Sequence, residues 1–198
     1  MLTLHDDLLP PALTEELAAA LAWVPMYFLR RIERNPAAHP LDTFWYYPLA
    51  VCDDPYTGDV EPQLTQLDAW AAPVVSTWTL IRNHLAAAGA PVRLYETEIA
   101  ANSYGSEGHP HFDIPRPEWR PGHLAAIVYG NREWDLAWGG ETLIFDEHEE
   151  VAHAVRPRPG RVAIIKGDPY HVARGVSRLC PEARRVLVFK MWLENFRP

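Results

Sequence analysis

The spacing of apolar residues changes about halfway along the chain. In the first half, apolar residues recur at helical intervals, which predicts helices over residues 14–23 and 62–88. Thr14 has a side chain that helices favour as an N-cap, and Gly89 follows the second helix where glycine commonly ends one. Pro73 lies inside the second segment and predicts a kink, because proline lacks the amide hydrogen that a helix interior needs.

Short extended segments dominate the second half of the chain. Apolar residues are grouped there in short runs that are separated by glycine and proline turns. This pattern predicts a β-sandwich or barrel, one face of which the two helices could cover, with an open α+β sheet as the alternative. Strands are predicted over residues 43–49, 92–102, 123–129, 141–145, 153–156, 161–165, 170–176 and 184–193.

Length and composition narrow the class of protein. A chain of 198 residues is most simply one domain, in which residues 1–91 form a helical support with the first strands and residues 92–198 form the barrel core. The net charge of -8 argues against a nucleic-acid partner. The sequence has no apolar run of about 18 residues and no signal-peptide pattern, so we expect no membrane partner and a cytoplasmic location. Cys52 and Cys180 lack metal-binding spacing and are expected to be buried, reduced thiols.

His111, Asp113 and His171 are the candidate metal ligands. Two imidazoles and one carboxylate match the set that holds non-haem Fe(II) and leaves three coordination positions open. Open positions indicate catalysis, because a structural metal site fills its coordination shell. A spacing of two residues on an extended segment puts His111 and Asp113 on one face, whereas His171 must arrive through tertiary folding. His109 shares that face, but no carboxylate follows it at the same offset.

Other conspicuous residues have simpler interpretations. The acidic run over residues 146–150 is typical of a solvated turn. Gly139-Gly140 is typical of a tight entry into a strand, because the lysine and helix of a phosphate loop do not follow. Trp134 and Trp138 either line a substrate pocket or belong to the core. Surface positions are expected for His123, His148 and His153.

A series of short motifs follows in order through the second half of the chain. They are Tyr104-Gly105, His111-Phe-Asp113, Asn131-Arg-Glu-Trp134, Gly139-Gly-Glu-Thr142, His171-Val172 and Arg184-Arg-Val186-Leu187. In these motifs, residues 102–192 resemble the Fe(II)- and 2-oxoglutarate-dependent dioxygenases, specifically the prolyl-4-hydroxylase-like branch. The resemblance implies a mainly β fold with flanking helices, whose core is a double-stranded β-helix (a jelly roll, as in cupins). It also implies Fe(II), 2-oxoglutarate and O2, with ascorbate as a supporting reductant.

The resemblance also assigns a binding group for 2-oxoglutarate. An arginine on the strand after the second histidine would pair with the far carboxylate of the co-substrate, because its planar fork matches a carboxylate. Arg184 and Arg185 are both candidates and point to opposite faces of a strand, and the match of Arg184-x-Val186 to the family motif favours Arg184. The family usually has serine where Val186 stands, so one hydrogen bond to the co-substrate is in doubt. Tyr129 is a further candidate for the same carboxylate, and Asn102 and Tyr104 are weaker ones for the other end.

The expected reaction is hydroxylation of an unactivated C–H bond, with desaturation, epoxidation and ring closure as open alternatives. A carboxylate at Asp113 favours this outcome, because halogenating relatives have a small residue there. A small molecule is the expected substrate, either a free or carrier-bound amino acid or a natural-product intermediate, and a peptidyl prolyl or other residue is the alternative. A non-redox, cupin-like metal isomerase or hydrolase and a catalytically silent binding barrel also remain open. Both a monomer and a homodimer are compatible with the sequence.

Overall fold

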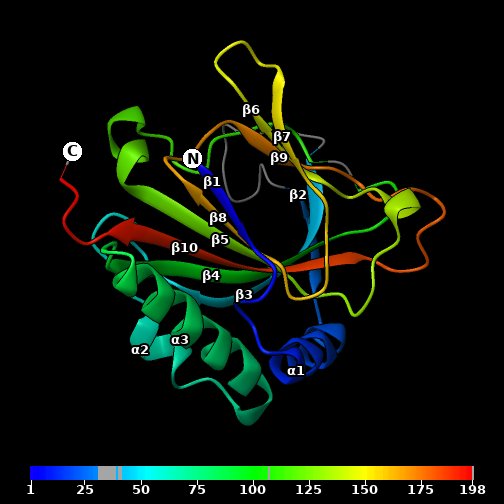
Figure 1. The fold of residues 1–198 in the computed structure, drawn as a ribbon, viewed down its shortest axis with the longest axis horizontal. Helices are drawn as coiled ribbons and strands as arrows, with labels where there is room; N and C mark the ends of the chain where they lie inside the picture. The colour runs from blue at the N-terminus through cyan, green and yellow to red at the C-terminus, as the bar shows by residue number, and fades with distance from the viewer. Residues whose placement is uncertain (31–38, 40–41, 107, 198) are drawn as a thin grey trace.

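The computed structural model describes residues 1–30, 39, 42–106 and 108–197, and consists mainly of two antiparallel sheets with helices on one side (Figure 1). The helices are α1 (Pro11–Ala22), α2 (Glu61–Leu64) and α3 (Ala72–Ala87), with short 3-10 turns at Ala69–Ala71, Pro117–Gly122 and Leu136–Trp138. The strands are β1 (Leu2–His5), β2 (Tyr27–Arg30), β3 (Thr43–Val51), β4 (Val92–Asn102), β5 (His123–Tyr129), β6 (Thr142–Phe145), β7 (Val151–Val155), β8 (Val162–Lys166), β9 (His171–Ala173) and β10 (Arg184–Leu193).

The two sheets face each other as in a jelly roll (Figure 1). The larger sheet has seven strands in the order β1-β8-β5-β10-β4-β3-β2, and the smaller has three in the order β7-β6-β9. Strand β1 at the start of the chain therefore pairs with β8 from the second half in one sheet. The mainly β fold with a double-stranded β-helix core is confirmed, and the open α+β sheet is not observed. A single domain stays a prediction, with which the interleaved strands agree.

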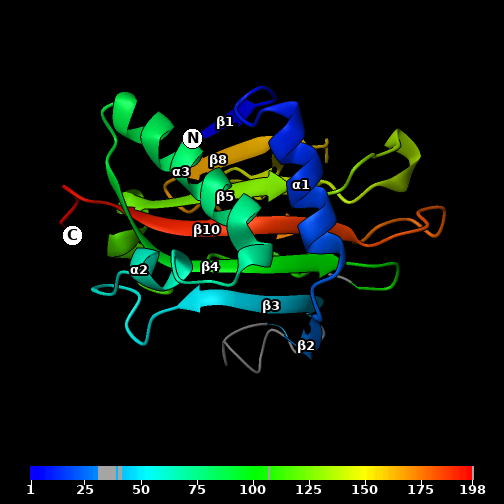
Figure 2. The ribbon, with the colours of Figure 1, turned by 90° about the horizontal axis from the view of Figure 1, so that it is seen from below.

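Helices α1 and α3 cover the outer face of the larger sheet, whose inner face is turned toward the smaller sheet (Figures 1 and 2). Successive side chains of the central strand β10 point to opposite faces of the sheet, so this strand contributes to both the packing under the helices and the inner face. Leu187 and Phe189 belong to the cluster that packs under the helices, and the ring of Phe189 lies 5.4 Å from that of Trp78 on α3. The intervening residues of β10 face a cavity between the sheets: Arg184, Val186, Val188 and Lys190. Helix packing therefore fixes which side chains of β10 can reach the site.

The predicted helix over residues 62–88 is wrong as one element. The chain instead forms α2, a 3-10 turn and then α3, which has Pro73 in its first turn. Proline is tolerated there because the first-turn amide has no partner inside the helix, so Pro73 begins a helix and does not kink one. Gly89 follows α3 with a positive φ of 75°, as expected for a residue that ends a helix.

Other element boundaries also differ from the prediction. Helix α1 begins at Pro11, so Thr14 is not its N-cap, and Trp23 beyond its end is 88% exposed. Strands β1 and β2 had no predicted counterpart, because both are short strands at the edges of the larger sheet. Strand β9 covers only part of the predicted segment 170–176. Cys52 and Cys180 are free thiols as predicted, although both are only partly buried. In the described part of the chain, no helix combines the length and apolar character of a membrane span.

An ion pair fastens β1 to the segment before β8 and predicts a pH effect on stability. Asp6 accepts hydrogen bonds from Nε of Arg161 at 2.6 Å and from Nη2 at 2.8 Å, and these bonds lower the pKa of Asp6 despite the opposing effect of burial. Because the pKa is lowered in the folded state, the stabilisation is present above the ordinary carboxyl pKa and is lost as pH falls through the folded value. Asp6 is partly exposed, so we expect Asp6→Asn to cost about 0.5–1 kcal/mol at neutral pH.

Urea unfolding of both proteins across this pH range measures the effect. The difference between wild type and Asp6→Asn should shrink toward zero as the solution is acidified below the folded pKa of Asp6. Asp7→Asn is the matched control, because Asp7 is an exposed neighbour and should change stability little at any pH. A difference that stays constant with pH would mean that Asp6 acts through packing.

Candidate active site

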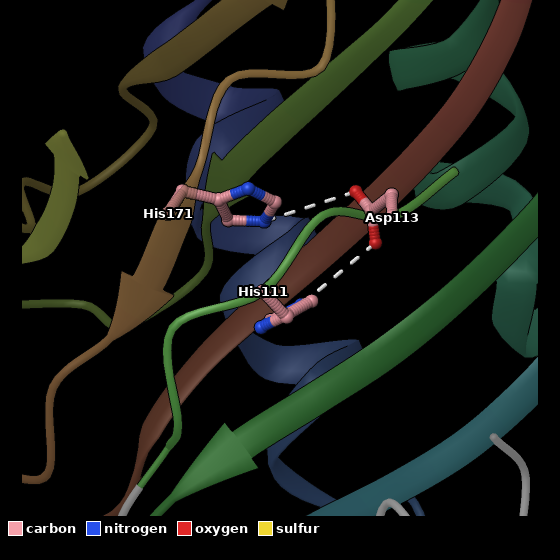
Figure 3. A group of neighbouring side chains, drawn as sticks. All are labelled: His111, Asp113 and His171. Atoms are coloured by element: carbon pink, nitrogen blue, oxygen red, sulfur yellow. Dashed lines mark ion pairs between the residues drawn. The ribbon is translucent and has the colours of Figure 1, made fainter. Parts of the chain in front are cut away.

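The side chains of His111, Asp113 and His171 converge (Figure 3), and all three line the cavity between the sheets. His111 lies in the segment after β4 and exchanges two backbone hydrogen bonds with His171 on β9, of 3.0 and 3.1 Å. The Nε2 atoms of His111 and His171 lie 4.0 and 3.8 Å from the two carboxylate oxygens of Asp113. One ligand atom from each residue fits within 4.8 Å of the others, so the three side chains could hold a metal ion together.

Backbone carbonyl groups orient both imidazoles. Nδ1 of His111 lies 2.8 Å from the carbonyl oxygen of His109, and Nδ1 of His171 lies 2.9 Å from that of Pro169. A carbonyl oxygen only accepts hydrogen bonds, so each Nδ1 carries the proton and each Nε2 keeps its lone pair toward Asp113. This is the tautomer that a metal ligand needs. The ring of His109 is exposed and stacks on His39 at 4.4 Å, so His109 contributes its carbonyl group to this arrangement.

Asp168 supports the ligand set from behind and was not among the predicted site residues. Its buried carboxylate accepts hydrogen bonds from the backbone N–H groups of Asp113 and Ile114, at 2.9 and 2.8 Å. Pro169, the next residue, supplies the carbonyl group that orients His171. One short segment therefore positions two of the three ligands. Burial and the nearby charge of Asp113 raise the pKa of Asp168 to about 6. In the sequence this segment had only the character of a turn.

Asp168→Asn is expected to weaken divalent-metal binding by about 10- to 100-fold, the usual effect of losing a group that orients metal ligands. The amide can accept only one of the two backbone hydrogen bonds, so the segment that holds Asp113 should loosen. The measurement is titration with Mn(II), followed by the EPR signal of the free ion. Asp146→Asn is the matched control, because Asp146 also accepts backbone N–H groups but in an exposed turn. Equal metal affinity in Asp168→Asn and wild type would contradict this role.

Lys190 brings a positive charge to the same site. Its Nζ lies 3.2 Å from Oδ1 of Asp113 and 3.7 Å from Oε2 of Glu96. Burial by itself would raise the pKa of Asp113, but the positive charge of Lys190 holds it well below its ordinary value. The carboxylate therefore remains ionised, which is the form that binds metal.

The prediction of a surface position for His123 is wrong. His123 is 1% exposed, and its Nε2 lies 2.9 Å from the hydroxyl of Tyr95. The reason is that β5 is an inner strand of the larger sheet, and all seven of its residues are buried. Burial lowers the pKa of His123 to about 4, so this imidazole is neutral. His148 and His153 are exposed, as predicted.

Arg184 lies on the cavity wall at the start of β10. It is 1% exposed, and its Nη2 donates to Oγ1 of Thr142 at 2.7 Å, while Nη1 lies 3.5 Å from Oδ1 of Asn102. The guanidinium carbon lies 5.1 Å from the centre of the Tyr129 ring. Within the described ranges, Nε of Arg184 has no hydrogen-bond partner. A buried donor without a partner is costly, so this end of the cavity fits an anionic ligand.

The other predicted site residues occupy different environments. Arg185 points away from the cavity, and its Nη1 donates to Glu182 at 2.9 Å. The hydroxyl of Tyr129 lies 2.9 Å from Oγ1 of Thr142, so it is satisfied behind the cavity wall. Tyr104 is 68% exposed and does not line the cavity, whereas Asn102 does. Thr142 was not among the predicted site residues, although it ends the Gly-Gly-Glu-Thr motif.

The two tryptophans lie beside the glycine pair at the entry to β6. Trp134 and Trp138 do not line the cavity, and Trp134 donates from Nε1 to the carbonyl oxygen of Gly139 at 2.9 Å. Gly140 has a φ of 75°, and a Cβ atom there would lie 3.1 Å from both Arg184 and Trp134. Glycine therefore allows the strand entry to pass close to Arg184, which agrees with the predicted tight turn.

Comparison with known families agrees with this site. Residues 99–194 match the model of the 2OG-Fe(II) oxygenase superfamily, and this range contains His111, Asp113, His171 and Arg184. This part of the chain belongs to the 2OG-Fe(II) oxygenase superfamily, and the protein is a 2-oxoglutarate-dependent dioxygenase, which uses Fe(II), 2-oxoglutarate and O2. A non-redox metal enzyme and a silent barrel are therefore not retained. No curated protein matches the chain significantly.

Several solved structures share the fold at low sequence identity. A prolyl hydroxylase from Trichoplax adhaerens, in complex with a peptide fragment of a hypoxia-inducible factor, is 13% identical, with a TM-score of 0.63 over 98% of this chain and 84% of that one. A Pseudomonas putida prolyl-4-hydroxylase is 19% identical, with a TM-score of 0.53 over 99% and 93%. HygX from Streptomyces hygroscopicus, with nickel and 2-oxoglutarate bound, is 14% identical, with a TM-score of 0.61 over 98% and 84%. At these identities the likeness describes the fold, and it includes prolyl hydroxylases, the branch that the motifs resemble.

Proposed function

We propose that His111, Asp113 and His171 hold the Fe(II) ion and that Arg184 anchors the far carboxylate of 2-oxoglutarate. The observation that carries this proposal is the convergence of two Nε2 atoms and a buried carboxylate, with each imidazole oriented by a carbonyl group. The buried Nε of Arg184, which lacks a partner in the described part of the chain, supports the second half of the proposal.

Each group has a separate part in this arrangement. When bound, iron and 2-oxoglutarate supply the oxidising chemistry, in which the keto acid yields succinate and carbon dioxide while O2 oxidises the substrate. The protein holds these groups and orients them, and Thr142 and Asn102 keep Arg184 in place through hydrogen bonds. Val186 and Val188 give the cavity an apolar wall between its two charged ends, which excludes water from the reacting groups.

The proposed reaction is hydroxylation of an unactivated C–H bond in a small molecule. Beyond the metal ligands, Glu98 and Lys190 also line the cavity, and side chains of both charges suit a small polar substrate. A free or carrier-bound amino acid or a natural-product intermediate is the proposed class. Asp113 favours hydroxylation over halogenation, because its carboxylate fills the position that a halide would need.

A peptidyl residue is the second candidate substrate. The observation that favours it is the fold shared with prolyl hydroxylases, one of which is in complex with a peptide fragment. The two candidates differ in the size of the molecule that must reach the cavity, so they can be separated with substrates of matched chemistry and increasing length.

Two assays test the proposed function in sequence. Anaerobic addition of Fe(II) and 2-oxoglutarate should produce the weak visible charge-transfer band of the chelate, and His111→Ala should remove it. Succinate release, with ascorbate present, is then measured against free amino acids, carrier-bound amino acids, natural-product intermediates and proline-containing peptides. Absence of both the band and succinate release under all conditions would overturn the proposal. Succinate release with peptides alone would transfer the activity to the second candidate.

A further inference from the structure

Lys190 occupies a position that the metal and co-substrate sites do not by themselves require. It is one of only two lysines in the sequence, which otherwise relies on arginine for positive charge. Its side chain is 12% exposed and lines the cavity from β10, on the same face as Arg184. Lys190 lies six residues after Arg184 on the same strand. Its charge is therefore close to the candidate metal ligands and distant from the end of the cavity where Arg184 lies.

The ammonium group of Lys190 lies between two carboxylates. In the pairing of β4 with β10, Lys190 is opposite Glu96, whose Oε2 lies 3.7 Å from Nζ. On the other side, Oδ1 of Asp113 lies 3.2 Å from Nζ. The exposed fractions of the Glu96 and Asp113 side chains are 13% and 9%, so solvent screens these ion pairs weakly. Glu96 thus helps to hold the ammonium group against Asp113.

We infer that Lys190 is a positioning residue that keeps one oxygen of Asp113 away from the metal. This inference rests on the proposed function, in which Asp113 is a metal ligand. Oδ1 of Asp113 lies 3.2 Å from Nζ of Lys190 and 4.0 Å from Nε2 of His111, whereas Oδ2 lies 3.8 Å from Nε2 of His171. With Oδ1 paired to Lys190, Asp113 would offer Oδ2 to the metal. A carboxylate that binds through both oxygens occupies two coordination positions, whereas one that binds through a single oxygen occupies one. The Lys190 ion pair therefore preserves the positions that 2-oxoglutarate and O2 need.

The choice of lysine over arginine follows from the same geometry. An ammonium group is a compact charge that can pair with one oxygen, whereas a guanidinium fork grips both oxygens of a carboxylate at once. Arginine at position 190 would compete with the metal for Asp113. A lysine that served only to fill space or to pair with Glu96 would be replaced by arginine with little effect. The two roles therefore predict opposite results for the conservative substitution.

Binding measurements on Lys190→Met and Lys190→Arg test the inference. Lys190→Met should bind Mn(II) at least as tightly as wild type but 2-oxoglutarate about 10-fold more weakly, since the second oxygen takes a co-substrate position. Lys190→Arg should bind Mn(II) about 10-fold more weakly. The visible spectrum of bound Co(II), which responds to coordination number, should differ between Lys190→Met and wild type before 2-oxoglutarate is added. None of these readouts depends on turnover.

The matched control is Lys166→Met, which removes the other lysine of the chain from an exposed position at the end of β8. It should leave both dissociation constants unchanged. The inference fails if Lys190→Met loses affinity for Mn(II) and 2-oxoglutarate in parallel, if it changes neither, or if Lys190→Arg behaves as wild type. If the wild-type protein binds Mn(II) but not 2-oxoglutarate, the proposed function itself is overturned. If the wild-type protein binds both and the Lys190 variants bind both equally well, only the inference about Lys190 fails.

Discussion

Replacing His171 with alanine is expected to lower 2-oxoglutarate turnover by at least about 1,000-fold, because a catalytic metal contributes several kcal/mol of transition-state stabilisation. The variant keeps one imidazole and one carboxylate, too few protein ligands to hold the ion firmly. Succinate formation and Mn(II) binding should therefore fall together. The fold should change little, since the His171 side chain faces the cavity and its Nε2 makes no protein hydrogen bond within the described ranges.

The control for His171→Ala is His153→Ala. His153 lies on β7 in the same small sheet, but it is exposed and does not line the cavity. It should retain metal binding and turnover. Thermal unfolding of both variants establishes that they remain folded. If His171→Ala binds Mn(II) as tightly as wild type, the proposed ligand set is wrong, and the other group of described residues that could hold an ion, Asp113, His123 and Asp168, becomes the candidate.

The second large effect is expected at Arg184. Arg184→Met should weaken 2-oxoglutarate binding by about 100-fold, because a charge-assisted, forked hydrogen bond to a carboxylate contributes about 3 kcal/mol. Mn(II) affinity should remain within a few-fold of wild type, since the metal ligands lie on other segments. Isothermal titration with each ligand separates the two effects. A loss of 2-oxoglutarate affinity with unchanged Mn(II) affinity distinguishes Arg184→Met from His171→Ala, in which Mn(II) binding itself is expected to be lost.

Arg184 is fully buried, so its substitution also risks the fold. Arg184→Lys keeps the charge and loses the planar fork, and it should bind 2-oxoglutarate with intermediate affinity. Arg185→Met is the matched control on the opposite face of β10, where the side chain pairs with Glu182. Wild-type 2-oxoglutarate affinity in Arg184→Met, with a loss in Arg185→Met, would transfer the anchoring role to Arg185.

The candidate metal ligands could be proposed from the sequence alone because the identities of these residues carry the chemistry. A His-x-Asp pair on an extended segment faces one way for local reasons, and the order of the surrounding motifs pointed to the later His171. The contact between His171 and Asp113 joins β9 to the irregular segment that follows β4, so it depends on tertiary folding. The alternation of side chains along β10 likewise predicted that Arg184 and Arg185 point to opposite faces of the sheet. Which of the two faces the cavity was decided by α1 and α3, because these helices cover the other face of the sheet.

The roles of the supporting residues could not be predicted from the sequence, because they depend on contacts between segments that are far apart in the chain. Asp168 acts on the backbone of Asp113 across 55 residues of sequence, and nothing in a Gly-Asp-Pro turn indicates such a partner. Lys190 lies in an apolar strand and acquires its role only when β10 pairs with β4 opposite Glu96. His123 had an ordinary polar character in the sequence, and its burial comes from the inner position of β5 in the larger sheet.

By itself, the sequence determined the types of ligand, the two-residue periodicity of the strands and the order of the motifs, because each of these is a property of neighbouring residues. The tertiary structure alone decided which side chains meet in the cavity, which imidazole nitrogens face the metal position, and which carboxylate oxygen Lys190 engages. These outcomes depend on the pairing of strands far apart in the chain and on the closure of two sheets, which local patterns do not specify.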